Sequence, residues 1–188
     1  MIYVGIDPGL DGGIVALEPL PSGGIEILLV EPMPTEPIGT KRIVSCRGVV
    51  KLLRATIELR PSLVVLEQQS PHPKDGKVSA FKTGRCFGML EGILSALGYP
   101  RRQVQPREWQ QVLNGIEGQD SKDRAVLLVG RELPKLNLMP GRRSKPHLGL
   151  SDAAAMALWG IRSVRSGEYA KPRLVDGHAS PETAWRGP

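Results

Sequence analysis

Three carboxylates stand where apolar segments of the chain meet polar ones. Asp7 ends the apolar run 2–7 and precedes a Pro-Gly pair, Glu67 ends the run 63–67, and Asp152 opens an Ala-rich stretch. Carboxylates at two strand ends and a helix start can converge in space although they lie far apart in the sequence. Carboxylate oxygens are ligands that Mg²⁺ and Mn²⁺ prefer, and paired ions of this kind drive phosphodiester hydrolysis. The pattern therefore predicts a metal-dependent nuclease.

Each of these acidic residues also has an ordinary structural interpretation. Asp7 fits a solvent-facing turn, Glu67 fits the exposed edge of a strand, and Asp152 fits a first helical turn, where it would offset the helix dipole. Together, however, the three positions favour one shared site. His147, five residues before Asp152, is a candidate fourth ligand or a group that positions the attacking water, and a surface loop position is the alternative.

The charge balance favours a polyanionic partner. The 188 residues include 25 Lys and Arg against 19 Asp and Glu, a formal net charge of +6. Basic side chains would hold a nucleic-acid backbone while the carboxylates hold metal ions. A basic protein with no nucleic-acid role would have the same charge, so composition alone leaves both interpretations open.

Basic side chains and one aromatic residue follow Glu67 along the chain. This mixture is typical of a loop that grips nucleic acid, although a solvated run of charges has the same composition. The candidate DNA contacts in this segment are Lys74, Lys77, Phe81, Lys82 and Arg85. Further candidate phosphate contacts lie near predicted helix starts or in a basic loop, at Arg107, Trp109, Lys122, Arg124, Arg142, Arg143 and Lys145.

The spacing of apolar residues predicts an α/β fold in which a mixed sheet is flanked by helices. Strands are predicted over 2–7, 12–18, 25–31, 63–67 and 103–105, the first three joined by hairpin turns. Helices are predicted over 45–59, 80–97, 106–113, 121–133 and 151–164, with Pro106 as a first helical residue and Ser121 and Ser151 as N-caps. Residues 32–37 are expected to form a Pro-rich connector, residues 134–149 an irregular loop, and residues 166–188 a poorly ordered tail.

Glycines recur on one face of the predicted helix 80–97, at Gly84, Gly88 and Gly92. Each costs about 1 kcal/mol relative to alanine in a helix interior. We therefore expect something to pack closely against this face. The chain's own sheet is the favoured candidate, and the same helix of a second subunit is the alternative.

The two cysteines, Cys46 and Cys86, lie in predicted helices and have no paired spacing. This favours buried free thiols in a reducing compartment over a disulfide or a zinc site. No apolar run approaches the roughly 18 residues of a membrane helix, and the first residues are typical of a strand rather than of a signal peptide. We expect a cytoplasmic protein with no membrane partner.

Four stretches of the chain together resemble the RuvC-type Holliday junction resolvases of the ribonuclease H-like superfamily. They occur in the family's order and span about residues 1–165, with 166–188 left as a tail. The stretches are Gly5-Ile6-Asp7-Pro8-Gly9, Leu66-Glu67-Gln68, the segment Gln105–Lys122, and Ser151-Asp152-Ala153-Ala154-Ala155-Met156-Ala157. Each is weak alone, but the set is specific.

The resemblance implies a nuclease domain over residues 1–165 with a ribonuclease H-like mixed five-stranded sheet flanked by helices. It implies two divalent ions, Mg²⁺ or Mn²⁺, held by Asp7, Glu67 and Asp152, and a basic residue near the cleaved phosphate at Lys122. It also implies a homodimer that cuts two strands of a four-way junction symmetrically.

The chain departs from the bacterial members of this family at two positions. They place an acidic or histidine ligand three residues before the last aspartate, where this chain has Gly149. His147 instead resembles the longer spacing of phage and organellar relatives, which would suit a phage-encoded enzyme acting in the host cytoplasm. The same bacterial members place an aromatic wedge three residues after the glutamate, where this chain has Ser70, and Phe81 is the candidate substitute.

The leading hypothesis is a structure-selective endodeoxyribonuclease that cleaves Holliday junctions and other branched DNA and leaves 5′-phosphate nicks. The alternatives are a ribonuclease H-type enzyme that cuts RNA in RNA–DNA hybrids and a branched-DNA-binding protein without catalysis. An actin-like phosphotransferase also has Asp-Pro-Gly after its first strand, but such enzymes need two such domains and 188 residues supply one.

Overall fold

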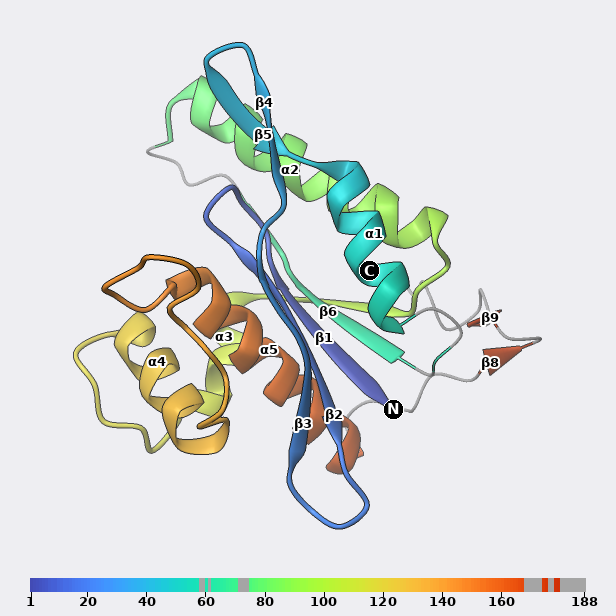
Figure 1. Ribbon diagram of the computed structural model, residues 1–188, viewed down its shortest axis with the longest axis vertical. Coiled ribbons are helices and arrows are strands. Elements are labelled where there is room, and N and C mark those ends of the chain that lie inside the picture. Colours follow the sequence, from blue (N-terminus) through green and yellow to red (C-terminus); the bar gives the residue numbers. More distant parts are fainter. Residues whose placement is uncertain (58–59, 61, 71–74, 168–173, 176–177, 180–188) are drawn as a thin grey trace.

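The centre of the molecule is a five-stranded sheet in the order β3-β2-β1-β6-β7 (Figure 1). The computed structural model describes residues 1–57, 60, 62–70, 75–167, 174–175 and 178–179. The sheet consists of β1 (Ile2–Asp7), β2 (Gly13–Pro19), β3 (Ile25–Pro32), β6 (Ser62–Glu67) and β7 (Arg101–Val104). The first three strands form an antiparallel meander, whereas β6 runs parallel to both β1 and β7. The predicted mixed five-stranded sheet is confirmed.

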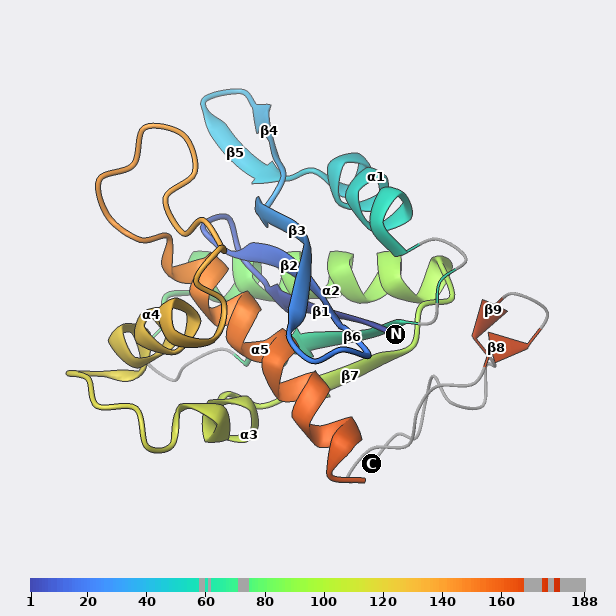
Figure 2. The same ribbon diagram turned by 60° about the horizontal axis from the view of Figure 1, so that its bottom comes forward.

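Helices cover both faces of this sheet (Figure 2). On one face lie α1 (Cys46–Ile57) and α2 (Lys77–Ala96). The other face carries α3 (Pro106–Trp109), the 3₁₀ turn η1 (Gln110–Leu113), α4 (Ser121–Glu132) and α5 (Leu148–Arg165). Two small sheets stand apart from the central one, formed by β4 (Thr35–Ile38) with β5 (Lys41–Val44) and by β8 (Leu174–Val175) with β9 (His178–Ala179).

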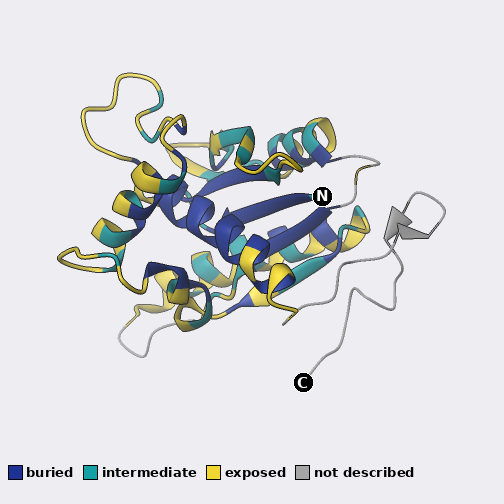
Figure 3. Ribbon diagram, turned by 90° about the horizontal axis from the view of Figure 1, so that it is seen from below, coloured by how far each residue is buried: buried dark blue, intermediate teal, exposed yellow. Residues whose placement is uncertain are grey.

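The strands β1 and β6 are apolar on both sides because helices cover both of their faces. In β1, Tyr3 belongs to the core beneath α5, whereas Ile2 and Val4 belong to the core beneath α1 and α2. Figure 3 shows buried positions concentrated in the middle of the molecule and exposed ones on the outer helices and loops. Strands packed on both faces give the side chains at their ends well-defined positions.

Helix α5 lies against the sheet at very short range. A Cβ atom at Gly5 would stand 1.9 Å from the carbonyl oxygen of Ala153, and a Cβ atom at Gly160 would stand 2.9 Å from Cγ2 of Val65. Glycine at both points allows backbone and side chain to approach this closely. The contact between Gly5 and Ala153 fixes the position of α5 along β1.

Two helices begin differently from the prediction. The N-cap of α5 is His147 rather than Ser151, whose hydroxyl instead donates to a backbone carbonyl within the first turn. The N-cap of α4 is Asp120 rather than Ser121, and its carboxylate accepts from the backbone N–H of Asp123 at 2.8 Å. In both cases an earlier side chain already supplies the acceptor that the free N–H groups need.

The predicted connector at 32–37 overlaps β4, the first strand of a β-hairpin. In this hairpin Ile38 pairs with Lys41, and Gly39 in the turn has a φ of +59°. Proline lacks an amide donor and so argues against a strand, but a ribbon of two strands has only edges, where proline is tolerated. The prolines concealed this element from the sequence pattern.

The glycine face of α2 is not covered by the sheet. The helix packs through Leu90 and Leu94, and a Cβ atom at Gly84, Gly88 or Gly92 would meet no heavy atom of the described chain within 4 Å. The prediction that the chain's own sheet packs against these glycines is therefore wrong. The alternative, a second subunit, stays a prediction.

The cysteines are free, as predicted, but Cys46 is exposed and Cys86 is half-buried, so the expected burial is wrong for Cys46. Its place in the first turn of α1 leaves it facing solvent. No helix in the described part of the chain is long and apolar enough to cross a membrane. Most of the predicted tail, at 168–173, 176–177 and 180–188, lies outside the described residues, as does Lys74.

Candidate active site

Three carboxylates gather at one edge of the central sheet. Asp7 is the last residue of β1 and Glu67 the last of β6, and these strands are parallel neighbours, so their carboxyl ends meet at the same edge. Asp152 lies in the second turn of α5 and is only 2% exposed. The charges of all three act on one another. Asp152 therefore lies close enough to Asp7 and Glu67 for its charge to act on both.

The electrostatics of this cluster are unfavourable to its negative charge. Burial raises the pKa of Asp7 well above its ordinary value, and the charges of Asp152 and Glu67 raise it further, whereas Lys122 lowers it. Burial also raises the pKa of Glu67 and that of Asp152, despite their hydrogen-bond donors. Buried like charges are costly unless a cation compensates them. The site is thus built to receive positive charge.

Lys122 of α4 supplies part of that charge. Its ammonium group donates a hydrogen bond to Oδ2 of Asp152. Burial lowers the pKa of Lys122, but Asp152, Asp7 and Glu67 together raise it more, so that it ends above its ordinary value. The lysine stays protonated. One ammonium group cannot balance three carboxylates.

The donor set fits a divalent ion. All three acidic groups offer oxygen, and Oδ1 of Asp152 is buried with no hydrogen-bond partner among the described residues. Nevertheless, no three acidic, histidine or cysteine side chains in the described ranges are already close enough together to hold one ion. Lys122 and the donors on Glu67 now occupy carboxylate oxygens, so an ion would have to exchange with these contacts.

Glu67 is held by two side-chain donors. Nε1 of Trp109 donates to its Oε1 at 2.8 Å, and Nε2 of Gln69 donates to its Oε2 at 2.8 Å. Trp109 is 2% exposed and ends α3, whose first turn is closed by a capping box of Gln105 and Glu108. Its predicted role as a phosphate contact is wrong, because the indole is buried and points its N–H at Glu67.

A signal for this contact existed in the sequence. The strand β7 pairs with β6, and Pro106 starts the helix that follows it, as predicted. A tryptophan in this first turn is thereby brought beside the end of β6. The pairing of β7 with β6, which local patterns do not give, was the missing piece of information.

His147 is buried, with 4% exposure, so the surface-loop interpretation is wrong. Its Nδ1 accepts from the backbone N–H of Leu150 at 3.3 Å. Burial lowers the pKa of His147, and Arg143 lowers it further, while Asp11 raises it. The structure does not bring His147 into the electrostatic network of the three carboxylates. A ligand role stays a prediction, which only its Nε2 can fulfil.

The glycine that stands three residues before Asp152 has a steric cause. A Cβ atom at Gly149 would lie 2.4 Å from the carbonyl oxygen of Asp11 and 2.6 Å from Cα of Gly12. The loop between β1 and β2 fills this space. No side chain, and hence no metal ligand, can stand at this position.

The remaining candidate DNA contacts in the described residues are exposed, except Arg124, which is half-buried. Lys77, Phe81, Lys82 and Arg85 lie on the N-terminal half of α2, where Phe81 is 70% exposed. Arg107 lies on α3, Arg124 on α4, and Arg142 and Arg143 in the loop before α5. These residues come from four separate segments, namely α2, α3, α4 and the loop before α5.

Comparison with known proteins identifies the fold. No protein-family model and no curated protein matches the chain. Among solved structures, RuvC from Thermus thermophilus in complex with a Holliday junction substrate matches with a TM-score of 0.60 and 18% identity over 89% of this chain and 97% of that chain. A second structure of Thermus thermophilus RuvC gives 0.58 and 25% identity over the same shares. The yeast mitochondrial Holliday junction resolvase Ydc2 gives 0.57 and 17% identity over 90% of this chain and 81% of that chain. The chain therefore has the ribonuclease H-like fold of the RuvC-type resolvases.

Proposed function

We propose that this protein is a metal-dependent endonuclease that cleaves Holliday junctions and other branched DNA. The observation that carries the proposal is the meeting of Asp7, Glu67 and Asp152, with Lys122, at one edge of the sheet. A similar structure, that of Thermus thermophilus RuvC, is in complex with a Holliday junction substrate. The net charge of +6 suits a polyanionic substrate.

The three carboxylates would hold two Mg²⁺ or Mn²⁺ ions. Such ions supply an activated water and neutralise charge on the phosphate and the leaving oxygen. The chain's own contribution is to orient the ligands, through Trp109 and Gln69 on Glu67, and to keep Asp152 out of bulk water. Lys122 would then leave Asp152 and turn its ammonium to the cleaved phosphate, and the product would carry a 5′-phosphate.

The DNA backbone would be held by basic side chains on several elements. Lys77, Lys82 and Arg85 project from the exposed half of α2, and Phe81 beside them offers an exposed ring for stacking on a base. Further contacts would come from the arginines on other elements, Arg107, Arg124, Arg142 and Arg143. Lys74 belongs to the same proposal but lies outside the described residues.

A homodimer would place two such sites on one four-way junction. The glycine face of α2 supports this arrangement, since a Cβ atom at Gly84, Gly88 or Gly92 would meet no heavy atom of the described chain within 4 Å. A Gly88→Glu variant should keep the fold of one subunit, because a Cβ atom there would meet no heavy atom of the described residues within 4 Å. Sedimentation of this variant should show a shift from dimer to monomer, and an unchanged dimer would exclude this surface as the interface.

The function is tested with a panel of DNAs in Mg²⁺, Mn²⁺ and EDTA. The panel contains a four-way junction, a flap, a linear duplex and an RNA–DNA hybrid. We expect metal-dependent nicks in the branched DNAs with 5′-phosphate ends. Cleavage of the hybrid instead would support a ribonuclease H-type activity, and binding without any product would support a non-catalytic DNA-binding protein.

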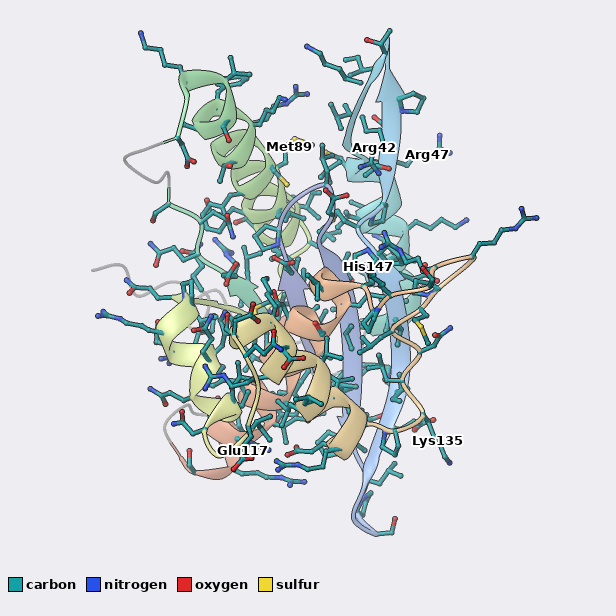
Figure 4. All side chains as sticks on the ribbon, turned by 90° about the vertical axis from the view of Figure 1, so that its left-hand side faces the viewer. Arg42, Arg47, Met89, Glu117, Lys135 and His147 are labelled. Atoms are coloured by element: carbon teal, nitrogen blue, oxygen red, sulfur yellow. The ribbon has the colours of Figure 1, made fainter. Side chains whose placement is uncertain are left out.

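The site is tested with Asp7→Asn and Asp152→Asn. Both variants should bind the junction about as well as the wild type but should lose cutting by several orders of magnitude, because they remove metal ligands. The control is Glu117→Gln, an exposed carboxylate in the loop before α4 that is labelled in Figure 4. Normal cutting by either aspartate variant would remove the assignment.

A further inference from the structure

The β4–β5 hairpin is an element that the carboxylate site does not use. It stands outside the central sheet and projects beyond it on the same side as the N-terminal half of α2 (Figures 1 and 4). Met33 and Val44 bury its base in the core beneath α1, whereas residues 36–42 are all exposed. The exposed part adds little to the core, so its surface is available to a partner.

This surface is basic and continues along α1. Residues 36–57 contain five basic side chains and one acidic one, Glu36, whose carboxylate accepts a hydrogen bond from the hydroxyl of Ser45. Three of them recur at i, i+4 and i+7, and thus on one face of α1, while Val49 and Leu53 are buried on the other. We name this surface the basic ridge, and its exposed residues are Lys41, Arg42, Arg47, Lys51 and Arg54.

The basic ridge begins beside the carboxylate site. The guanidinium group of Arg42 lies 3.1 Å from Oδ1 of Asp11, in the loop that directly follows Asp7. This exposed pair contributes little stability, but it places the hairpin against that loop. Gly149, just before Asp152, touches the same loop from α5. A DNA strand that passes the carboxylates and leaves over this loop therefore runs onto the ridge.

We propose that the basic ridge binds the phosphate backbone of one duplex arm of branched DNA, with the β4–β5 ribbon lying along a groove of that arm. The proposal rests on the proposed function, because the arm is the one that enters the carboxylate site. A two-stranded ribbon fits the major groove of B-DNA, and each basic contact to a phosphate releases counterions. An acidic protein would also be attracted, but the continuity with the nuclease site favours DNA.

The test measures junction binding as a function of salt. All variants are made in the Asp7→Asn background, so that the DNA stays intact. Arg47→Ala/Lys51→Ala is compared with its parent on junctions with long and with shortened arms. The plot of log affinity against log salt should lose about 0.9 in slope for each phosphate contact removed, hence about 2 for this pair on long arms. Shortened arms, which do not reach α1, should show no difference.

Single substitutions compare the loss of one charge inside the basic ridge with the loss of one charge outside it. Lys51→Ala should lower the slope by about 1 on long arms, whereas Lys135→Ala, an exposed lysine at the opposite end in Figure 4, should leave it unchanged. Lys41→Ala repeats the test at the exposed hairpin turn without altering α1. Thermal unfolding of each variant verifies that these surface changes leave the fold intact.

The outcomes separate the two proposals. Equal salt slopes for the double variant and its parent on long arms would overturn the proposal for the basic ridge. Equal losses of slope on long and on shortened arms would also overturn it, because the contact would then lie at the crossover of the junction. If the ridge variants bind like their parent but the wild type still cuts junctions, only the ridge proposal fails and the nuclease proposal stands. A wild type that neither binds nor cuts branched DNA overturns both.

Discussion

Trp109 donates its indole N–H to Oε1 of Glu67 at 2.8 Å and so ties a site carboxylate to the hydrophobic core beneath α5. A buried tryptophan cannot move without disturbing that core. The orientation of Glu67 is therefore set before any ligand arrives, at least on its Oε1 side. This relationship makes the indole N–H a positioning group, although it faces no substrate.

Replacing Trp109 by phenylalanine keeps a large aromatic ring but removes the donor. We expect the single-turnover cutting rate to fall roughly tenfold, about the 1.4 kcal/mol that one hydrogen bond contributes, with junction affinity unchanged. Calorimetry with Mn²⁺ should show weaker metal binding. Trp159→Phe, a loss of another largely buried indole, is the control and should cut normally. Equal rates for both variants would show that Glu67 needs no indole donor.

Removing Lys122 takes the compensating charge from Asp152. Without divalent ions, Lys122→Ala should be less stable than the wild type by about 1–2 kcal/mol, less than for a fully buried pair because the lysine side chain is 49% exposed. Added Mn²⁺ should then raise its melting temperature more than that of the wild type, since an ion can replace the lost ammonium. Lys122→Arg retains the charge and serves as the control. An equal response to Mn²⁺ in all three proteins would contradict this compensation.

The raised pKa of Asp7 predicts how stability depends on pH. The pKa of the Asp7 carboxyl is higher in the folded state than in the unfolded state. In EDTA, its contribution to stability is therefore greatest below the ordinary pKa, where the carboxyl is protonated in both states. That contribution is lost as the pH rises through the raised pKa. Asp7→Asn removes the effect, so its melting temperature should fall less between acidic and neutral pH and exceed that of the wild type at pH 7. For a domain of this size, 1 kcal/mol corresponds to about 2–4 °C.

Excess Mg²⁺ should reverse this order, because the wild type gains an ion that the asparagine variant binds poorly. Calorimetric melting curves over the pH range, with and without Mg²⁺, measure both effects. If the melting temperatures of the wild type and Asp7→Asn change in parallel with pH in EDTA, Asp7 ionises in the folded state without a loss of stability.

The close approach of α5 to β1 predicts a large effect of a small change. Gly5→Ala places a methyl group against the carbonyl oxygen of Ala153, 1.9 Å away, so α5 must shift. We expect a loss of more than about 3 kcal/mol in stability and a loss of cutting, because Asp152 moves with the helix. Gly130→Ala lies in α4, where the new methyl group would meet no heavy atom of the described part of the chain within 4 Å, and should instead gain about 1 kcal/mol. Urea unfolding of both variants, followed by cutting assays below the unfolding midpoint, separates the two outcomes.

The two roles of His147 are separable by one substitution. Asparagine is a good N-cap but offers no imidazole, so His147→Asn should retain the stability that His147→Ala loses, about 0.5–2 kcal/mol. If capping is the whole role, His147→Asn should cut junctions at nearly the wild-type rate. A stable asparagine variant that has lost metal-dependent cutting would instead identify Nε2 of His147 as a ligand.

The meeting of Asp7 and Glu67 was predictable from the sequence because it follows from local patterns. Each residue ends an apolar run, and two such runs that form parallel neighbours bring their last residues to one edge. The place of Asp152 was predictable only in outline, since its helix begins one turn earlier than expected. The resemblance to the resolvases supplied what local patterns lack, the expectation that Asp152 shares one site with Asp7 and Glu67.

What remained hidden depends on contacts between distant segments. The hydrogen bond from Trp109 and the capping role of His147 arise from packing that no spacing records. The β4–β5 hairpin was concealed for a different reason, because its prolines argue against a strand. A short hairpin of this kind does not show the regular alternation of apolar residues by which strands are recognised. In this chain it forms the first part of the basic ridge.

Helix α5 is buried from Gly149 to Ile161 and carries Asp152 within that stretch. Amide protons in such a segment are expected to exchange with solvent only when the whole domain opens. Turnover must then proceed around a stationary Asp152, and any rearrangement during catalysis falls to the partners at the surface, chiefly the side chain of Lys122. Deuterium uptake that is slow in α5 and fast at the start of α4 would indicate a rigid helix that carries Asp152 and a mobile segment that carries Lys122.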